Sequence, residues 1–491
     1  FDPIEDPLVY LVPRGYTRGG FDDLFEQGEM PDLEAMLNTY EEVIGALDNA
    51  SQNSIVRRVA QNYTSDYIAH WSAFLSALRL RDAEGWGDAQ VLMQSLTNAS
   101  ENPMDRLAAA LVENTDIRIY LDAAADAPAD DEEAPAQPVL APASANAEAA
   151  TASNIRTAFR QYIDAATAQP EQLSQFDLFF TYARDVNQWL LEASTAPNGT
   201  GQFLFEQFQA AESANPLGVL NAFVSRSELD IIRNFGRSIA VTLDDRAMEF
   251  VYDYIDTQWQ RQIMAPYGAS LTMTFPFNRN SDADFPLVEF ADLFAPEGKI
   301  AVFDATYLSR FKAEDGSFEP RPSFLLSGQA DMTDEAKRAF ERFAEITASM
   351  FTEANPYLEF SVRTGFMSNT LSELNLSSGI TLHQFRHGPL FWDAQTWPVT
   401  GLLNSDLTLR LFARSRAVIN ETFVGPWSWF RLIEAGEATI NPSLGLAEVA
   451  FSHEAGTVRL QFEAPVRHNP FAPGFFSDVL VSDGLFEAST N

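Results

Sequence analysis

The stretch Phe275-Pro276-Phe277-Asn278-Arg279-Asn280-Ser281 is the most informative part of this 491-residue chain. Proline between two aromatic residues predicts a fixed turn. The next block, Leu287–Phe294, predicts a short helix because Pro296 and Gly298 stand just beyond its end. We expect the aromatic side chains of both blocks to clamp helices against a β domain. The expected core anchors are Phe275, Phe277, Phe290 and Phe294.

Upstream of this stretch, apolar residues recur at three- and four-residue steps, which is typical of amphipathic helices. One apolar stripe extends from Leu33 to Leu47, and another extends from Ile68 to Leu78. Helical periodicity resumes at Ile155 and is predicted to end at Pro266, because proline lacks the backbone N–H that continues a helix. The chain therefore begins with helical domains.

Downstream, Thr333 is the predicted N-cap of one more helix. Beyond Pro356 the apolar period changes from 3.6 to 2, which indicates strands at Leu358–Val362, Leu407–Leu411 and Val458–Phe462. Strands separated by turns favour an antiparallel β-sandwich. The predicted fold class is α+β multidomain, with helical domains followed by this C-terminal sandwich.

Between residues 122 and 152 the composition is rich in Ala, Pro, Asp and Glu and has no basic residue. Such a segment cannot bury enough apolar surface to offset ordering entropy, so it is predicted to be a disordered linker. The predicted domains are a helical domain at 1–121, the linker at 122–152, a central helical domain with the Phe-Pro-Phe block at 153–355, and the β-sandwich at 356–491.

Charge and composition exclude several function classes. The net charge is −37, which opposes nucleic-acid binding because that needs Lys and Arg to replace condensed counterions. The chain has no cysteine, so disulfides, thiolate nucleophiles and Cys-bound metals are excluded. No apolar segment reaches the roughly 18 residues that span a bilayer.

The strongest metal-binding pattern is His383-Gln384-Phe385-Arg386-His387. On the strand predicted at 380–385, the two histidines would lie roughly 13 Å apart, too far to share an ion. Paired carboxylates such as Asp244-Asp245 are expected on a solvated face. The sequence also lacks a phosphate-binding loop and a nucleophile elbow. We therefore predict no catalytic residue, no metal and no cofactor.

Further blocks of aromatic, proline and glycine residues follow in order. They are His387-Gly388-Pro389, Trp397-Pro398, Gly425-Pro426-Trp427 with Arg431 close behind, and Asn469-Pro470-Phe471. With the opening stretch, this series resembles the IcmF/TssM family, and Val12–Phe21 and Tyr67–Leu75 resemble that family's N-terminal blocks. One departure is Val399-Thr400-Gly401 after Pro398, where the family usually has glycine directly after the proline.

The resemblance implies the periplasmic segment of the inner-membrane scaffold of type VI secretion. It implies a C2-like β domain that binds the outer-membrane lipoprotein TssJ, contact with TssL at the inner membrane, and self-association in a ring. It also implies that transmembrane helices and an NTPase-like domain precede this segment. Two alternatives are a secreted acidic glycan hydrolase and a free periplasmic binding protein.

Two sets of residues are proposed from these blocks. The tail after Asn469 is expected to be exposed, and aromatic residues with a polar rim make interaction hot spots. The candidate partner-binding residues are Trp392, Trp397, Phe471, Phe475 and Phe476. The candidate structural signature comprises Phe275, Pro276, Phe277, Phe290, Phe294, Gly298, His387, Gly388, Pro389, Gly425, Pro426, Trp427 and Arg431.

Overall fold

A computed structural model describes residues 11–26, 28–79, 81, 83–98, 102–119, 143–167, 173–210, 215–313, 316–318, 332–378, 381–399, 405–441, 444–481 and 484–487. The described residues form two compact units, one up to Val251 and one from Tyr252 onward. We call them the helical unit and the C-terminal unit. The boundary lies within one long helix rather than at the predicted position 355/356. Within the described residues, no helix combines the length and apolar character needed to cross a membrane.

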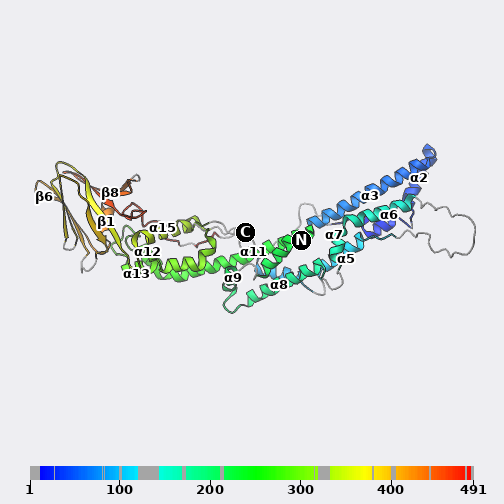
Figure 1. Ribbon diagram of the computed structural model, residues 1–491, viewed down its shortest axis with the longest axis horizontal. Helices are drawn as coiled ribbons and strands as arrows, with labels where there is room; N and C mark the ends of the chain where they lie inside the picture. Colours follow the sequence, from blue (N-terminus) through cyan, green and yellow to red (C-terminus); the bar gives the residue numbers. More distant parts are fainter. Residues whose placement is uncertain are drawn as a thin grey trace, which may run out of the picture. The chain divides into compact units, whose positions relative to one another are not determined.

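The helical unit consists of helices and one 3-10 turn (Figure 1). Its elements are the 3-10 turn η2 (Arg14–Tyr16), α1 (Arg18–Leu24), α2 (Pro31–Ile44), α3 (Asn49–Ala77), α4 (Trp86–Leu96), α5 (Pro103–Thr115), α6 (Ala143–Ala158), α7 (Arg160–Ala166), α8 (Gln175–Thr195), α9 (Thr200–Gln209), α10 (Pro216–Arg226) and the first part of α11 (Asp230–Trp259).

Helices from the two predicted helical domains pack together in this unit. Helix α3 packs on α6, α5 packs on α7, and α8 packs on both α4 and α10. Tyr67 and Trp71 anchor α3, since Tyr67 donates a hydrogen bond to the Asn114 carbonyl at 2.6 Å and Trp71 donates one to the Tyr16 carbonyl at 2.8 Å. Residues before 121 and after 153 thus share one core.

The predicted linker is wrong at its C-terminal end. Residues 143–152 belong to α6, where Ala145 and Ala152 are buried, and Thr151 contacts Thr64 of α3 with 3.3 Å between the hydroxyl oxygens. Alanine is the strongest helix former, and its small side chain lets two helices approach closely. The Ala-rich composition of residues 143–152 is therefore that of a packed helix. The rest of the predicted linker, 122–142, lies outside the described residues.

The C-terminal unit begins with the end of α11 and continues through helices to the sandwich. Its helical elements are the π-turn η4 (Gln260–Met264), α12 (Ala265–Met273), α13 (Leu287–Phe294), α14 (Lys299–Phe303), the π-turn η5 (Asp304–Leu308), the 3-10 turn η6 (Ser309–Phe311), α15 (Asp334–Met350) and α16 (Ser428–Ala435). The predicted helices at 287–294 and after Thr333 are confirmed, and the Thr333 side chain accepts from the Ala336 N–H at 3.1 Å.

The predicted helix end at Pro266 is wrong. The chain passes from α11 through η4 into α12 without leaving helical conformation, and Pro266 lies in the first turn of α12. A proline is tolerated in a first turn, because the N–H that it lacks would have no partner within that helix. The π-turn before it supplies the local change in hydrogen bonding.

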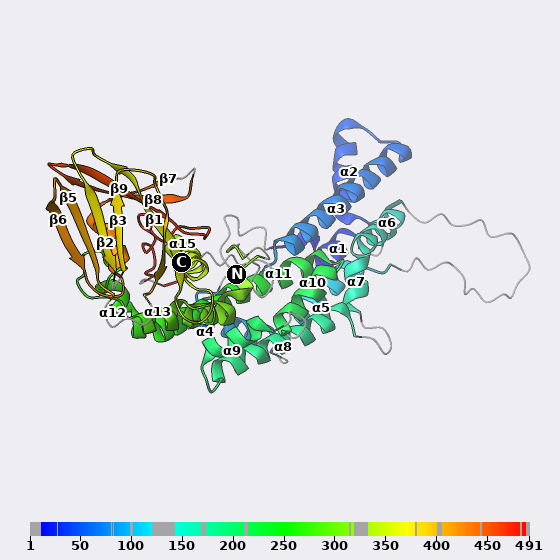
Figure 2. The same ribbon diagram turned by 60° about the vertical axis from the view of Figure 1, so that its left-hand side comes forward.

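Two antiparallel sheets form the sandwich, and Figure 2 shows them with most strands labelled. The five-stranded sheet has the order β4-β1-β9-β8-β7, and the four-stranded sheet has the order β3-β2-β5-β6. Buried and solvent-facing residues alternate along β1, β2, β5 and β9, as expected when two sheets bury their inner faces. The predicted fold class is confirmed. The strands are β1 (Leu358–Met367), β2 (Glu373–Ser378), β3 (Thr381–Arg386), β4 (Asp393–Trp397), β5 (Leu407–Ala413), β6 (Arg416–Phe423), β7 (Glu437–Asn441), β8 (Leu446–His453) and β9 (Gly456–Glu463).

The last described residues of the chain return to the C-terminal end of α11. Asp256 accepts a hydrogen bond from the Leu485 N–H at 2.7 Å, and the Trp259 indole N–H donates to the Val481 carbonyl at 3.2 Å. Burial raises the pKa of Asp256 to about 6, and its backbone hydrogen bonds oppose that rise only in part. The folded protein therefore holds a proton on this carboxyl at higher pH than the unfolded chain does.

This buried carboxyl predicts a pH dependence of stability. Between the unfolded pKa near 4 and the folded pKa of about 6, the native state binds more protons than the unfolded state, so the free energy of unfolding falls as pH rises. We expect the unfolding free energy of Asp256→Asn, minus that of wild type, to grow by roughly 2 kcal/mol from pH 4 to pH 7. Urea denaturation across this range measures it. Asp253→Asn is the control, because it removes an exposed charge on the same helix that contributes less than burial to the raised Asp256 pKa, and an equal pH effect in both variants would contradict the assignment.

Candidate functional site

The Phe-Pro-Phe block closes a loop that faces the sandwich. The Phe275 N–H donates to the Ala283 carbonyl, and the Phe285 N–H donates to the Phe275 carbonyl, both at 2.8 Å. Phe275 and Phe285 are buried, and the peptide bond between Phe275 and Pro276 is cis. The block therefore presents its aromatic residues from a closed loop between α12 and α13.

Aromatic side chains from distant blocks meet beside this loop. Trp427 lies at the centre, with ring centroids 4.8 Å from Trp397 and 5.1 Å from Phe290. Its indole N–H donates to the Phe285 carbonyl at 2.7 Å, and the Trp397 indole donates to the Pro426 carbonyl at 2.7 Å. Both tryptophans are fully buried. We call Phe290, Trp397, Trp427, Phe430 and Phe476 the aromatic junction.

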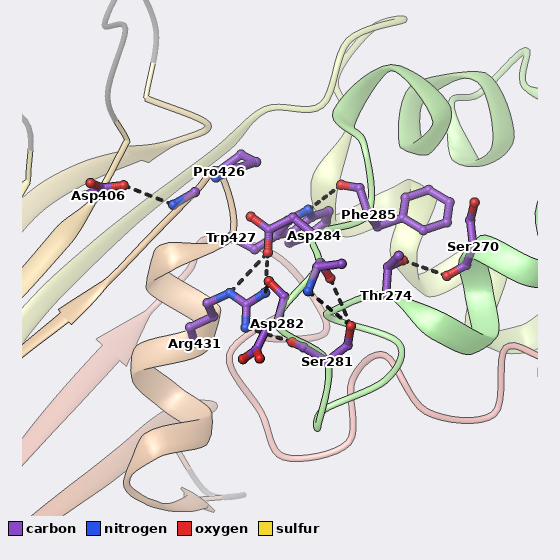
Figure 3. Close-up of polar contacts among 12 residues, drawn as sticks. Ser270, Thr274, Ser281, Asp282, Asp284, Phe285, Asp406, Pro426, Trp427 and Arg431 are labelled. Carbon is purple, nitrogen blue, oxygen red and sulfur yellow. Dashed lines mark hydrogen bonds and ion pairs between the residues drawn. The ribbon is translucent and has the colours of Figure 1, made fainter.

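A largely buried ion pair joins α16 to the same loop (Figure 3). The Arg431 guanidinium donates to Asp284 and also to the carbonyls of Ser281 and Asp282, at 3.0 and 3.1 Å. Arg431 also lies 4.3 Å from the Phe275 ring centroid. One arginine thus satisfies the carboxylate and two loop carbonyls.

Gly425 is required where α16 approaches this ion pair. Its φ is +89°, and a β-carbon there would lie 2.0 Å from an Asp284 carboxylate oxygen. Gly298 has a similar role beside α13, because a β-carbon there would lie 2.8 Å from the Leu293 carbonyl. These glycines allow close backbone approach.

The junction is packed rather than hollow. A cavity of about 120 Å³ lies beside it, lined in part by Phe275, Phe277, Phe430 and Phe471. Small-molecule pockets usually exceed about 300 Å³. The arrangement therefore favours a structural role, in which the helices of the C-terminal unit are fixed to the sandwich.

The block His387-Gly388-Pro389 lies apart from this junction, in the exposed connection between β3 and β4. The His387 ring hydrogen-bonds to the Leu371 carbonyl at 2.8 Å. His383 is buried on β3, and its ring contacts Asp393 and the Gln395 amide of β4. The two histidines thus have separate partners. Within the described residues, no group of three His, Cys, Asp or Glu side chains is placed to hold a metal.

The C-terminal tail is buried, so its predicted exposure is wrong. Asn469 holds it against the sandwich, since its amide donates to the carbonyls of Gly445 and Phe462 at 3.0 and 2.9 Å. The phenylalanines that follow then pack onto α16 and β1, as in the Phe430–Phe471 stack at 5.0 Å. The predicted partner residues Trp397, Phe471, Phe475 and Phe476 are all buried, whereas Trp392 is only partly covered.

An exposed aromatic surface lies instead around the outer face of the five-stranded sheet. The Arg363 guanidinium lies 4.2 Å from the Trp392 ring centroid, and Arg459 lies 5.7 Å from that of Phe366. Phe391 is 74% exposed. We call Arg363, Phe366, Trp392 and Arg459, together with Phe391 that precedes Trp392 in the chain, the outer-face patch.

Sequence reasoning missed most of this patch for a definable reason. Strict alternation from Leu358 would place Phe366 on the buried face, but the pairing of β1 with β9 shifts register between Thr364 and Phe366. Such a bulge reverses the side on which the following residue points. The glycine at position 365 was the signal that could have indicated it.

With this geometry described, two regions match known families. Residues 4–116 match the family described as IcmF-related: Intracellular multiplication and human macrophage-killing. Residues 360–465, which contain nearly all of the sandwich, match the Type VI secretion protein IcmF C2-like domain. These matches confirm the resemblance to the IcmF/TssM family, and one match lies in each half of the chain.

Comparison with individual proteins also finds components of type VI secretion systems. The type VI secretion system component TssM1 of Pseudomonas aeruginosa is 21% identical over 295 residues, which are 58% of this chain and 26% of that protein. The matched region thus spans about a quarter of that relative. A type VI secretion system membrane core complex chain has a TM-score of 0.72 at 17% identity, covering 97% of this chain and 91% of its own. A type VI membrane complex chain has a TM-score of 0.67 at 14% identity, with 93% and 85% covered. At these identities, the two structures establish the shared fold.

Proposed function

We propose that this chain is the periplasmic part of an inner-membrane-anchored scaffold in a type VI secretion membrane complex, and that it bridges to the outer-membrane lipoprotein TssJ. The match of residues 360–465 to the IcmF C2-like domain carries this proposal. Contact with TssL and assembly in a ring belong to the same proposal. The relatives are components of secretion complexes, which favours a non-enzymatic role over the glycan-hydrolase and free-binding-protein alternatives.

Within the sandwich, the outer-face patch is the surface best suited to a protein partner. Aromatic and arginine side chains carry most of the energy of protein interfaces. The patch supplies both, and its two arginines stand out on a chain with a net charge of −37. A standard interface buries about 800 Å² on each partner, an area that this face and the exposed connection before β4 can supply. We therefore assign lipoprotein binding to this face. Of the partner-binding residues predicted from the sequence, Trp392 is the one that lies on it.

This assignment predicts a large loss of affinity on removal of two aromatic rings. The double substitution Phe391→Ser and Trp392→Ala is expected to weaken TssJ binding at least tenfold, about 1.4 kcal/mol, because both rings would leave the contact. Isothermal titration calorimetry of the full chain against the soluble domain of the cognate lipoprotein measures this. Ile440→Ser is the matched control, since Ile440 is 46% exposed on β7 at the opposite edge of the same sheet. Equal affinities for both variants would refute the location.

A further inference from the structure

Helix α2 in the helical unit presents an apolar stripe to solvent. Met36, Tyr40, Val43 and Ile44 are 71, 48, 76 and 67% exposed. At 100° per residue they fall, with Leu33 and Leu37, on one stripe roughly 120° wide. This is the stripe that the sequence places on one helix face, yet no residue of α2 is buried within the described structure. Helix α2 therefore offers a continuous apolar face that the described residues cover only in part.

The helix is well formed by local signals. Pro31 occupies its first turn with Asp32 and Glu34, and Gly45 ends it with a φ of 113°. Glu41 accepts from the Leu47 N–H at 3.1 Å and from the Gln52 side chain at 2.6 Å, which ties α2 to the start of α3. Isolated helices of about this length are marginal in water, and most helical stability in proteins comes from packing of the apolar face. A formed helix with a largely exposed apolar face is suited to docking.

The charged residues beside this apolar face indicate the chemistry of the partner that would bind it. The sequence from Gly19 to Val56 contains no Lys or Arg. On the helix, Asp32 borders one side of the stripe, and Glu34 and Glu41 border the other. The stripe is thus an apolar surface with acidic margins on both sides. The acidic residues of this segment are Asp22, Asp23, Glu26, Glu29, Asp32, Glu34, Glu41, Glu42 and Asp48.

These acidic margins disfavour three other occupants. Pairing of α2 with α2 of a second copy would bring like charges together along the contact, which is destabilising. An anionic membrane surface attracts basic segments and repels acidic ones. The acidic stretch Asp130-Asp131-Glu132-Glu133 of this chain carries the same charge sign as α2.

We propose that α2 is a docking site for an amphipathic helix of another protein, one whose apolar stripe is flanked by Lys or Arg. The two apolar stripes pair, and basic side chains of the partner face Asp32, Glu34 and Glu41, in the manner of charged margins that set partner choice in paired helices. This site lies in the helical unit and is separate from the lipoprotein site proposed on the sandwich. The chain then has two proposed interaction surfaces. The outer-face patch carries arginines, whereas α2 is bordered by carboxylates and selects a basic partner.

The test uses the full chain and a synthetic probe. The probe is a labelled helical peptide of about 20 residues with leucines at i, i+3, i+4 and i+7 and lysines beside them, compared with a twin in which glutamate replaces every lysine. Fluorescence anisotropy is expected to show binding of the lysine peptide only. The variant Met36→Ser with Val43→Ser is expected to weaken that binding at least tenfold, and its thermal stability is expected to equal that of wild type because neither side chain is buried.

The matched control is Val288→Ser with Val302→Ser, which removes two exposed valines from the C-terminal unit at unchanged net charge. Equal loss of binding in both variants would overturn the proposal, because binding would then not depend on α2. So would preference for the glutamate peptide, binding to phosphatidylglycerol vesicles that the α2 variant abolishes, or a dimer in sedimentation that the α2 variant dissociates.

Discussion

Replacing Trp427 by alanine is expected to lower the free energy of unfolding of the C-terminal unit by about 3–5 kcal/mol. The side chain is fully buried, so its removal leaves a cavity between Trp397, Phe290 and Phe476. It also removes the indole N–H that pairs with the Phe285 carbonyl, and a buried carbonyl without a donor carries a further penalty. The two losses act at the same junction.

Urea denaturation of the full chain measures this loss, and hydrogen exchange of the β1 and β9 amides assigns the transition to the C-terminal unit. Trp392→Ala is the matched control, because it removes the same side chain from the partly exposed outer-face patch. It is expected to change stability by less than about 1 kcal/mol. Equal effects of the two substitutions would contradict the central position of Trp427 in the aromatic junction.

Replacing Arg431 by alanine is expected to cost about 2–4 kcal/mol of stability, because removing one partner leaves a largely buried charge unpaired. The Arg431 and Asp284 side chains are 17 and 18% exposed. The substitution also leaves the Ser281 and Asp282 carbonyls without their Arg431 donor, so the Phe-Pro-Phe loop loses its more buried ion pair with α16. Arg431→Lys keeps the charge but not the planar fork, and an intermediate loss is expected.

Urea denaturation measures this effect too, and the double variant Arg431→Ala with Asp284→Ala gives the coupling between the two residues. Arg279→Ala is the matched control, since Arg279 pairs with Glu434 at 3.5 Å while 50% exposed. Surface ion pairs contribute about 0–1 kcal/mol. Losses for Arg431→Ala no larger than those for Arg279→Ala would show that the buried pair does not hold the loop.

Sequence periodicity predicted the helices and strands well where the apolar residues follow one clear period. The strands predicted at Leu358–Val362 and Val458–Phe462 follow from alternation alone, because each sheet buries one face. The predicted helix end at Pro266 was wrong because the presence of a proline does not reveal whether it ends one helix or lies in the first turn of the next. The end of the linker failed because alanine is common both in packed helices and in low-complexity segments.

The site was harder to predict because burial depends on contacts between distant segments. Phe471 and Phe476 look like an exposed aromatic tail in the sequence, yet Asn469 binds two carbonyls that lie elsewhere in the sandwich. Phe366 looks like a core residue until the register shift in β1 is known. Neither outcome can be derived from the local pattern, since each depends on which backbone groups come together in the folded domain.

The register shift in β1 also separates two kinds of residue position in this strand, those that face the core and those that face outward. Residues before the shift, such as Val362, fill the space between the sheets, so their volume is constrained by packing. Phe366 faces outward and is 50% exposed, so substitutions there alter the outer surface of the sheet while the interior stays filled. A single extra residue in one strand therefore leaves one aromatic position of the sandwich free to vary while the packing between its two sheets is preserved.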